Sequence, residues 1–164
     1  MSHPKTADLE ALLVALVSGG VEFVVVGGVA AVLHGAPVTT LDLDIVHRRT
    51  EENVGRLLTV LEDLDAETMP ARLPPLRPTR EMLLGRGQLN LSTRLGPLDP
   101  LCVLHSGEDY DALHADAVTL SDGSLELKTI DLDTLIRVKT EAGRAKDKLT
   151  VPLLIALRDT RSQK

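Results

Sequence analysis

Residues 21–46 of the chain read VEFVVVGGVAAVLHGAPVTTLDLDIV. The stretch begins with a short apolar run rich in valine, which predicts a buried strand. This run ends in the glycine pair Gly27-Gly28, and residues 29–33 then predict a small helix. A strand that turns through two glycines into a helix lets backbone N–H groups come close to an anion. Glycines also form such turns without any ligand, so the pair by itself is weak evidence for a phosphate site.

Two aspartates stand near the end of the same stretch. Residues 41–46 alternate, so the strand that they predict carries its leucines and Ile45 on one face and Asp42 and Asp44 on the other. Two carboxylates held this close repel each other unless a positive charge lies between them. The pair therefore indicates a metal site, or else an exposed Asp-x-Asp on an edge strand. A glycine turn thirteen residues before paired carboxylates is more specific, because it places an anion site and a cation site on one short unit.

The rest of the chain predicts a mixed sheet flanked by helices. Apolar residues at helical spacing predict helices over 9–17, 50–64, 80–84, 108–116, 132–142 and 148–158. Strands are expected over 88–93 and 98–104 and in a hairpin at 121–124, and four prolines predict an irregular loop over 65–79. The predicted fold class is therefore α/β (α+β) with C-terminal helices. Since no linker or repeat divides residues 1–164, we expect a single domain.

Composition narrows the classes of function. The 164 residues include 18 basic and 24 acidic side chains, and the resulting net charge of −6 argues against non-specific DNA binding. One Phe, one Tyr and no Trp exclude a platform on which several bases stack. A single cysteine excludes an internal disulfide. No signal-peptide core and no apolar run long enough for a bilayer occur, so no membrane partner and a cytoplasmic location are expected.

Asp99 and Lys139 are candidate site residues outside the opening stretch. Asp99 begins an apolar strand, where it would complete a set of three carboxylates or else serve as a turn residue beside prolines. Lys139 falls on the buried stripe of the helix over 132–142, where a lysine must either extend to the surface or meet an anion. Arg144 and Lys146 follow this helix and belong either to the same site or to a charged connection between helices.

The order of these motifs resembles the nucleotidyltransferases of the DNA polymerase beta superfamily. More narrowly, it is similar to the small bacterial branch that includes abortive-infection-type toxin nucleotidyltransferases. The motifs that carry the resemblance are VVGGVA at 25–30, HG at 34–35, TLDLDI at 40–45, LNL at 89–91, GPLD at 96–99, LIRVK at 135–139 and GRAKD at 143–147. Together they extend over nearly the whole chain.

The resemblance implies a polymerase-beta-like core and a set of site residues. It implies that two magnesium ions, or manganese in their place, are held by three carboxylates, those of Asp42, Asp44 and Asp99. It implies that Gly27 and Gly28 contact the triphosphate of a bound NTP such as ATP. It further implies that phosphate charge is offset by the basic residues Lys139, Arg144 and Lys146, with Lys139 counted among the catalytic residues.

The resemblance also implies an activity. This is the transfer of a nucleoside monophosphate from NTP to an acceptor, with release of pyrophosphate. The acceptor expected from the likeness is a tRNA end or a protein hydroxyl, and the protein would be the toxin of a pair with an antitoxin partner. Modification of a small molecule such as an antibiotic is an alternative within the same chemistry.

Two departures from the family pattern keep a second class of function open. Gly28 stands where many members of the superfamily have serine, so a hydroxyl contact to phosphate is missing. Residues 38–40 offer no arginine before the paired aspartates, although relatives often have one there. A catalytically silent module that binds a nucleotide or a protein partner on the same fold is therefore the alternative to an enzyme.

Charge and aromatic content add two expectations about substrates. Residues 71–94 carry five arginines and one glutamate, a net charge of +4, and residues 137–148 carry a net charge of +3. These segments predict a basic rim for a polyanionic acceptor inside an acidic protein. Because Phe23 lies in the buried strand, we expect aliphatic or arginine side chains to hold the nucleobase.

Overall fold

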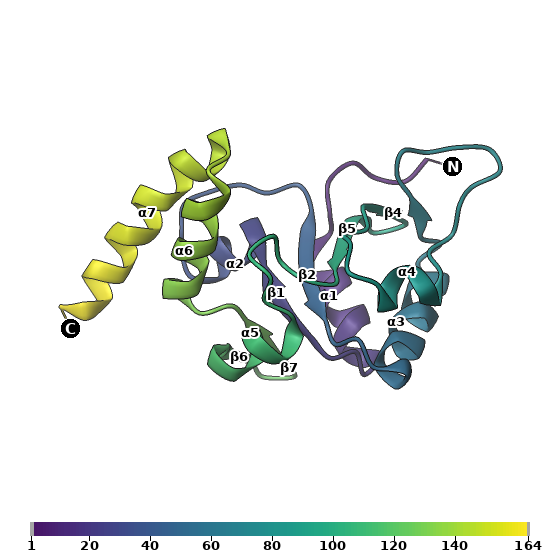
Figure 1. Ribbon diagram of the computed structural model, residues 1–164, viewed down its shortest axis with the longest axis horizontal. Helices are drawn as coiled ribbons and strands as arrows, with labels where there is room; N and C mark the ends of the chain where they lie inside the picture. The colour runs from purple at the N-terminus through teal and green to yellow at the C-terminus, as the bar shows by residue number, and fades with distance from the viewer. Residues whose placement is uncertain (1, 164) are drawn as a thin grey trace.

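The computed structural model describes residues 2–163 and contains a seven-stranded mixed sheet (Figure 1). Its strands are β1 (Phe23–Val26), β2 (Leu43–His47), β3 (Glu67–Thr68), β4 (Leu91–Thr93), β5 (Gly96–Leu101), β6 (Val118–Asp122) and β7 (Leu125–Thr129). They lie side by side in the order β3-β4-β5-β2-β1-β7-β6. The predicted fold class, a mixed sheet flanked by helices, is confirmed.

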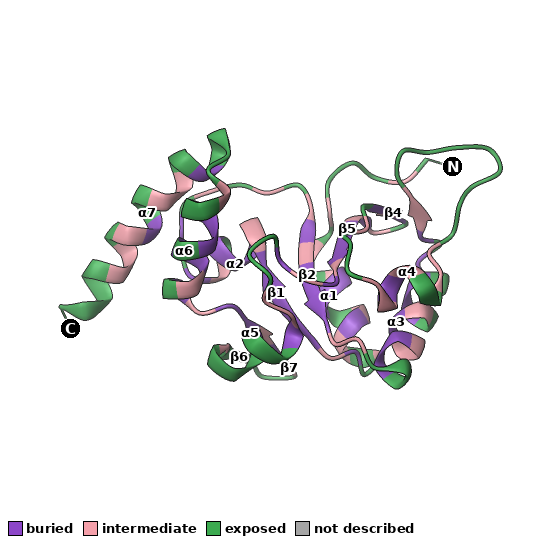
Figure 2. Ribbon diagram, viewed as in Figure 1, coloured by how far each residue is buried: buried purple, intermediate pink, exposed green. Residues whose placement is uncertain are grey.

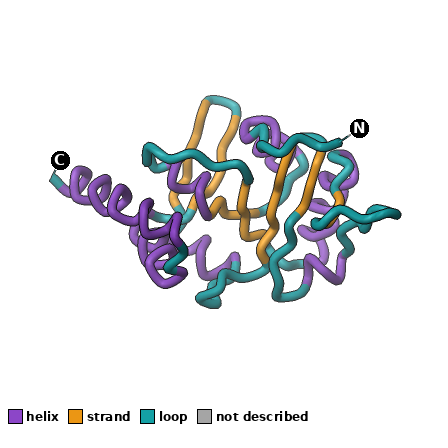
Figure 3. Tube along the Cα trace, turned by 90° about the horizontal axis from the view of Figure 1, so that it is seen from above, coloured by secondary structure: helices purple, strands orange, loops and turns teal. Residues whose placement is uncertain are grey.

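The helices lie on both faces of this sheet (Figure 3). They are α1 (Leu9–Ser18), α2 (Gly27–Leu33), α3 (Glu51–Asp63), α4 (Arg80–Leu84), α5 (Tyr110–Asp116), α6 (Leu132–Ala142) and α7 (Ala145–Ser162). Helix α2 packs on β1 and β2 and contacts α6, and α6 in turn packs along α7. Helix α7 extends away from the sheet (Figure 1). No helix within residues 2–163 combines the length and the apolar character needed to span a membrane.

The centre of the sheet is its most buried part, as Figure 2 shows. All four residues of β1 are buried, and in β2 Leu43, Ile45 and Val46 are fully buried while Asp44 is partly exposed. Strand β2 pairs antiparallel with β1 and parallel with β5. The register places Asp44 opposite Val26 on one side and opposite Asp99 on the other. The fold therefore brings the end of β1, the first aspartate pair and the third aspartate to one place.

The helices begin where short polar side chains cap them. Thr50, Asp109 and Asp131 each accept a hydrogen bond from a backbone N–H three residues further on. Asp8 does the same for α1, so this helix begins after Asp8. Such a cap contributes about 1 kcal/mol to the stability of its helix.

Several predicted boundaries differ from those of the structure. Helix α2 begins directly at Gly27, and α7 begins at Ala145 and not at residue 148. The reason for the second difference is Asp147, whose carboxylate accepts a hydrogen bond from the backbone N–H of Arg144 and so fixes the first turn of α7. Pro152 consequently lies inside the helix. Residues 65–79 are a loop as predicted, except for the two-residue strand β3.

Candidate active site

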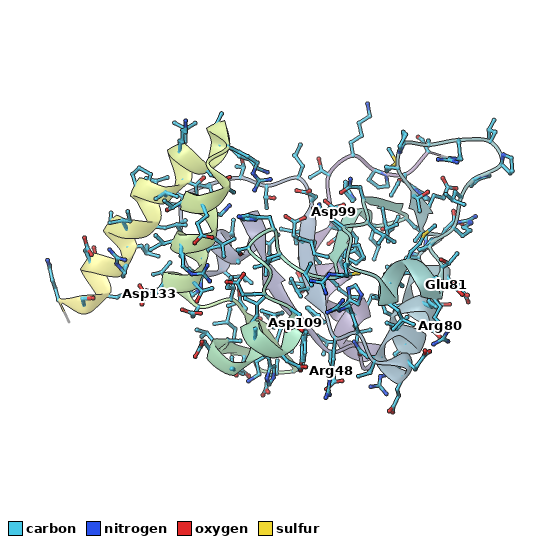
Figure 4. The ribbon with its side chains drawn as sticks, viewed as in Figure 1. Arg48, Arg80, Glu81, Asp99, Asp109 and Asp133 are labelled. Atoms are coloured by element: carbon cyan, nitrogen blue, oxygen red, sulfur yellow. The ribbon has the colours of Figure 1, made fainter. Side chains whose placement is uncertain are left out.

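Three aspartates from neighbouring strands form a carboxylate cluster. Asp42 directly precedes β2, Asp44 lies on β2, and Asp99 lies on β5, where Figure 4 labels it. One carboxylate oxygen from each of them lies within 4.8 Å of the other two. The sequence predicted all three as one set, and the parallel pairing of β2 with β5 brings them together.

Burial and mutual repulsion disturb the ionisation of this cluster. The pKa of Asp99 is raised to about 8, mainly by burial, with hydrogen bonding to Asp42 and the negative charge of Asp44 adding to the effect. The pKa of Asp44 is raised as well, by burial and then by the charge of Asp42. Burial and the negative charge of neighbouring carboxylates thus favour the protonated forms of Asp44 and Asp99.

The cluster has the donor set of a divalent-cation site. Carboxylate oxygens are the ligands preferred by magnesium and manganese. One of these oxygens, Oδ1 of Asp44, is buried and has no hydrogen-bond partner among the described residues. A buried carboxylate oxygen without a partner is costly, and a bound cation would remove that cost. The residues present therefore fit a divalent cation.

The glycine pair lies directly against the cluster. Gly27 has φ +66°, and a Cβ at this position would lie 2.3 Å from Oδ2 of Asp44. A Cβ on Gly28 would lie 2.8 Å from Oγ1 of Thr40. That hydroxyl donates a hydrogen bond to the backbone carbonyl of Asp42 at 3.1 Å. Glycine is required here because the turn passes so close to these two side chains.

Thr40 was not among the residues predicted for the site. Its hydroxyl lies directly against Gly28. The only signal in the sequence is a small hydroxyl residue two positions before Asp42.

A cavity of about 700 Å³ begins at the cluster. Gly27 and Asp44 line one part of it, and Lys139 and Arg144 line another. Aliphatic residues form part of its walls, namely Leu101, Val103, Leu104, Ile130, Leu135 and Val138. Arg86, Gln88, His105 and Glu141 add polar groups to the lining. A volume of this size is typical of a site for a small molecule or cofactor.

Lys139 is buried and paired with a carboxylate of its own chain. Its Nζ lies 3.3 Å from Oδ1 of Asp147, while Nε of Arg144 lies 2.8 Å from Oδ2 of the same residue. The side chain of Asp147 is fully buried. Burial alone would raise the pKa of Asp147, but the hydrogen bond from Arg144 and the charge of Lys139 outweigh it and lower this pKa. A lysine on the buried stripe was predicted either to extend to the surface or to meet an anion. Lys139 does the second, and the anion is the carboxylate of Asp147.

Proteins with a similar structure are known, although none is found by sequence. No family model matches the chain, and no curated protein sequence matches it. Among solved structures, the lincosamide antibiotic adenylyltransferase LnuA with lincomycin bound is similar over 94% of this chain and 99% of its own, with 12% identity and a TM-score of 0.63. The chain therefore has a nucleotidyltransferase fold.

Two further solved structures share this nucleotidyltransferase fold. A putative nucleotidyltransferase from Thermotoga maritima, TM1012, matches over 98% of both chains with 15% identity and a TM-score of 0.54. The antibiotic-resistance factor ANT(2'')-Ia matches over 94% of this chain and 90% of its own, with 14% identity and a TM-score of 0.58. The predicted resemblance to nucleotidyltransferases is supported at the level of the fold.

Only some of the residues predicted for phosphate binding line the cavity. Lys146 is exposed in the first turn of α7 and does not line the cavity. Its positive charge nevertheless offsets part of the rise in the pKa of Asp44. Gly28 lies beside Gly27 without lining the cavity. Lys139, Arg144 and Gly27 line it directly.

Several arginines of the predicted basic rim bind other groups of the chain. Arg77 pairs with Asp65 at 2.7 Å, and Arg80 pairs with Glu51 at 2.9 Å. Arg94 donates to the backbone carbonyl of Asp63. Three of the five arginines in residues 71–94 are thus held by groups of the protein itself.

Proposed function

We propose that the protein transfers a nucleoside monophosphate from an NTP to a hydroxyl group and releases pyrophosphate. One observation carries the proposal. Asp44 of the three-carboxylate cluster lines a cavity of about 700 Å³ that is also lined by Lys139 and Arg144. An acidic end suited to cations beside a basic wall suited to phosphates is the chemistry that a metal-bound triphosphate requires.

The carboxylates of Asp42, Asp44 and Asp99 would hold the cations, two magnesium ions or manganese in their place. Such ions, when bound, neutralise phosphate charge and stabilise the attacking and leaving oxygens. The same ions would satisfy Oδ1 of Asp44, the buried oxygen without a partner.

The chain's own residues place the nucleotide. Gly27 leaves room for the phosphates beside Asp44, and Lys139 and Arg144 offset phosphate charge from the other wall. The nucleobase packs against aliphatic residues such as Val103 and Leu135, in line with the lack of aromatic residues.

The proposed reaction forms one bond at the α-phosphorus and breaks another. The acceptor hydroxyl oxygen forms a bond to the α-phosphorus, and the bond from that phosphorus to the bridging oxygen of the β-phosphate breaks. Pyrophosphate leaves with the electron pair. The hydroxyl proton passes to a carboxylate oxygen of Asp99.

Labelled nucleotides test the proposal. We expect Asp42→Ala to lose magnesium-dependent transfer of label from α-³²P-NTP by about a hundredfold or more, since it removes a ligand of the cations. Asp122→Ala, an exposed aspartate in the β6–β7 hairpin, is the matched control and keeps full activity. Full activity of Asp42→Ala would place the reaction elsewhere.

Release of pyrophosphate, measured beside NTP binding by calorimetry, separates the enzyme from the alternative of a silent binding module. Both would bind NTP in the presence of magnesium, but only the enzyme would produce pyrophosphate. NTP binding without any product from any acceptor would favour the module.

The identity of the acceptor is the finer part of the proposal. A tRNA end, a protein hydroxyl and the role of a toxin with an antitoxin partner rest on the family resemblance alone. Modification of a small molecule has additional support, because LnuA is a lincosamide antibiotic adenylyltransferase and ANT(2'')-Ia is an antibiotic-resistance factor.

A further inference from the structure

A second cavity, of about 620 Å³, also reaches the carboxylate cluster. It lies over the β3–β4–β5 side of the sheet, whereas the first cavity extends towards α6. The two cavities share no lining residue. Asp44 lines the first, and Asp99 lines the second. The cluster therefore stands between two separate spaces.

Two segments far apart in the sequence build the walls of this second cavity. On one side the N-terminal segment is held by His3, which bonds through Nδ1 to Ser92 at 2.8 Å and through Nε2 to Asp65 at 3.1 Å. On the other side the loop after β3 is held by the backbone of Met69, which donates to Asn90 at 2.8 Å. In Figure 1 this loop and the N-terminal segment both lie beside β4.

We infer that the second cavity binds the acceptor, and that the acceptor is a hydroxyl-bearing small molecule with a mainly apolar surface and no phosphate group. This inference rests on the proposed function and adds the class and the location of the second substrate.

Geometry supports two separate spaces for the two substrates. In an in-line displacement the attacking oxygen and the leaving oxygen lie on opposite sides of the phosphorus. If the nucleotide occupies the cavity with Asp44, Lys139 and Arg144, the attacking hydroxyl must come from another side of the cluster. The second cavity offers that approach, with Asp99 in its wall.

The walls of the second cavity favour a small apolar molecule. Pro4, Met69, Leu91 and Pro97 supply much of its lining. Its volume lies within the range of about 300–1,000 Å³ that is typical of small-molecule sites.

Charge and aromatic content disfavour an RNA end in this cavity. The carboxylates of Asp99 and Glu67 face it, and Lys5 is the one lysine in its described lining. The chain's Phe23 and Tyr110 are both buried elsewhere, so no Phe or Tyr is available there to stack on a base. A phosphate next to Glu67, which does not belong to the carboxylate cluster, would be repelled.

A partition experiment tests the class of acceptor. The protein is incubated with magnesium and α-³²P-NTPs in three arms, with total tRNA, with lysate protein, or with the dialysable small molecules of a cell lysate. We expect a new labelled product in the dialysable fraction, separated from the NTP and its hydrolysis products by chromatography. Label in tRNA or in protein would overturn this inference and leave the proposed function intact, whereas label in none of the arms would overturn both.

A thiol placed in the wall tests the location. The chain's single cysteine, Cys102, is buried, so Met69→Cys introduces a selectively reactive thiol at a lining residue that is 49% exposed. Leu73→Cys is the matched control in the same loop, because Leu73 is 94% exposed and does not line the cavity. Each variant is compared before and after reaction with a bulky maleimide.

We expect modified Met69→Cys to transfer label at least about tenfold more slowly, with its NTP affinity, measured by calorimetry, unchanged. Modified Leu73→Cys should retain both properties. Unimpaired transfer by modified Met69→Cys would show that the acceptor binds elsewhere. Loss of NTP affinity would show that the second cavity is part of the nucleotide site and would also overturn the inference.

Discussion

At the scale of single residues, Asp99 shows how a fold sets the chemistry of a side chain. Its carboxyl group would titrate near pH 4 in an unfolded chain, but burial and its acidic neighbours raise its pKa to about 8. Between these values the folded protein keeps a proton that the unfolded chain has lost. The free energy of unfolding of the metal-free protein therefore falls as the pH rises from about 4 to about 8.

The fall in the free energy of unfolding with rising pH gives a prediction for the Asp99→Asn variant. The variant cannot ionise, so at pH 8 without metal we expect its free energy of unfolding to exceed that of the wild type by about 1–3 kcal/mol. The gain should shrink at pH 5, and stabilisation by magnesium should be lost. Urea unfolding at both pH values measures these effects, with the exposed Asp122→Asn as the control. A gain that is independent of pH would contradict the prediction.

At the scale of elements, two basic side chains at the junction of α6 and α7 share one buried carboxylate. Lys139 near the end of α6 and Arg144 at the start of α7 both bond to the buried carboxylate of Asp147. We expect Asp147→Asn to lower the free energy of unfolding by about 3 kcal/mol, because it leaves the buried ammonium of Lys139 without a counter-charge. Urea unfolding measures the loss.

Two further variants make this prediction specific. Asp159→Asn removes an exposed carboxylate of the same helix and should cost no more than about 0.5 kcal/mol. Adding Lys139→Met to Asp147→Asn removes the uncompensated charge and should recover part of the stability. Equal losses in Asp147→Asn and Asp159→Asn would show that this carboxylate does not hold Lys139.

The elements also show how far the sequence alone leads. The alternation around Asp42 and Asp44 and the helical stripe around Lys139 are local patterns, and both the elements and their faces follow from them. Asp147 was not predicted as the partner of Lys139, because a carboxylate after Gly143 has the pattern of an ordinary helix connection. Strand β3 was not predicted either, since two residues become a strand only by pairing with β4.

At the scale of the whole molecule, the sheet order decides what meets at the cluster. Residues 2–5 and residues 67–71 both line the second cavity because each segment is held beside β4, His3 by Ser92 and Met69 by Asn90. The contact of His3 with Ser92 joins residues 89 positions apart in the sequence. No periodicity signals such a contact, so the second cavity could not be predicted from the sequence. The first cavity is lined by residues of β1, β5 and α6, which are also far apart in the sequence. Of its lining, only Gly27, Asp44, Lys139 and Arg144 were predicted.

The nucleotide should join parts of the molecule that otherwise meet weakly. Asp44 and Gly27 belong to the sheet and its first turn, whereas Arg144 caps α7, a helix that extends away from the sheet (Figure 1). We expect α,β-methylene-ATP with magnesium, which cannot release pyrophosphate, to slow amide exchange at the start of α7 and at the turn from β1 to α2. At a concentration one hundred times Kd, the gain in global stability is about 2.7 kcal/mol.

Hydrogen exchange followed by mass spectrometry measures this coupling. Helix α1 lines neither cavity along residues 9–14, so its peptides report only the global gain and serve as the internal control. Slowing at α7 beyond that of α1 is the expected result, because the proposed function has the phosphates bind both Arg144 and the metal site at Asp44. Arg144→Ala should remove the extra slowing at α7 while leaving that at the β1–α2 turn. If the nucleotide slows exchange at α7 no more than at α1, the triphosphate does not reach Arg144, and the basic wall of the cavity is not its binding site.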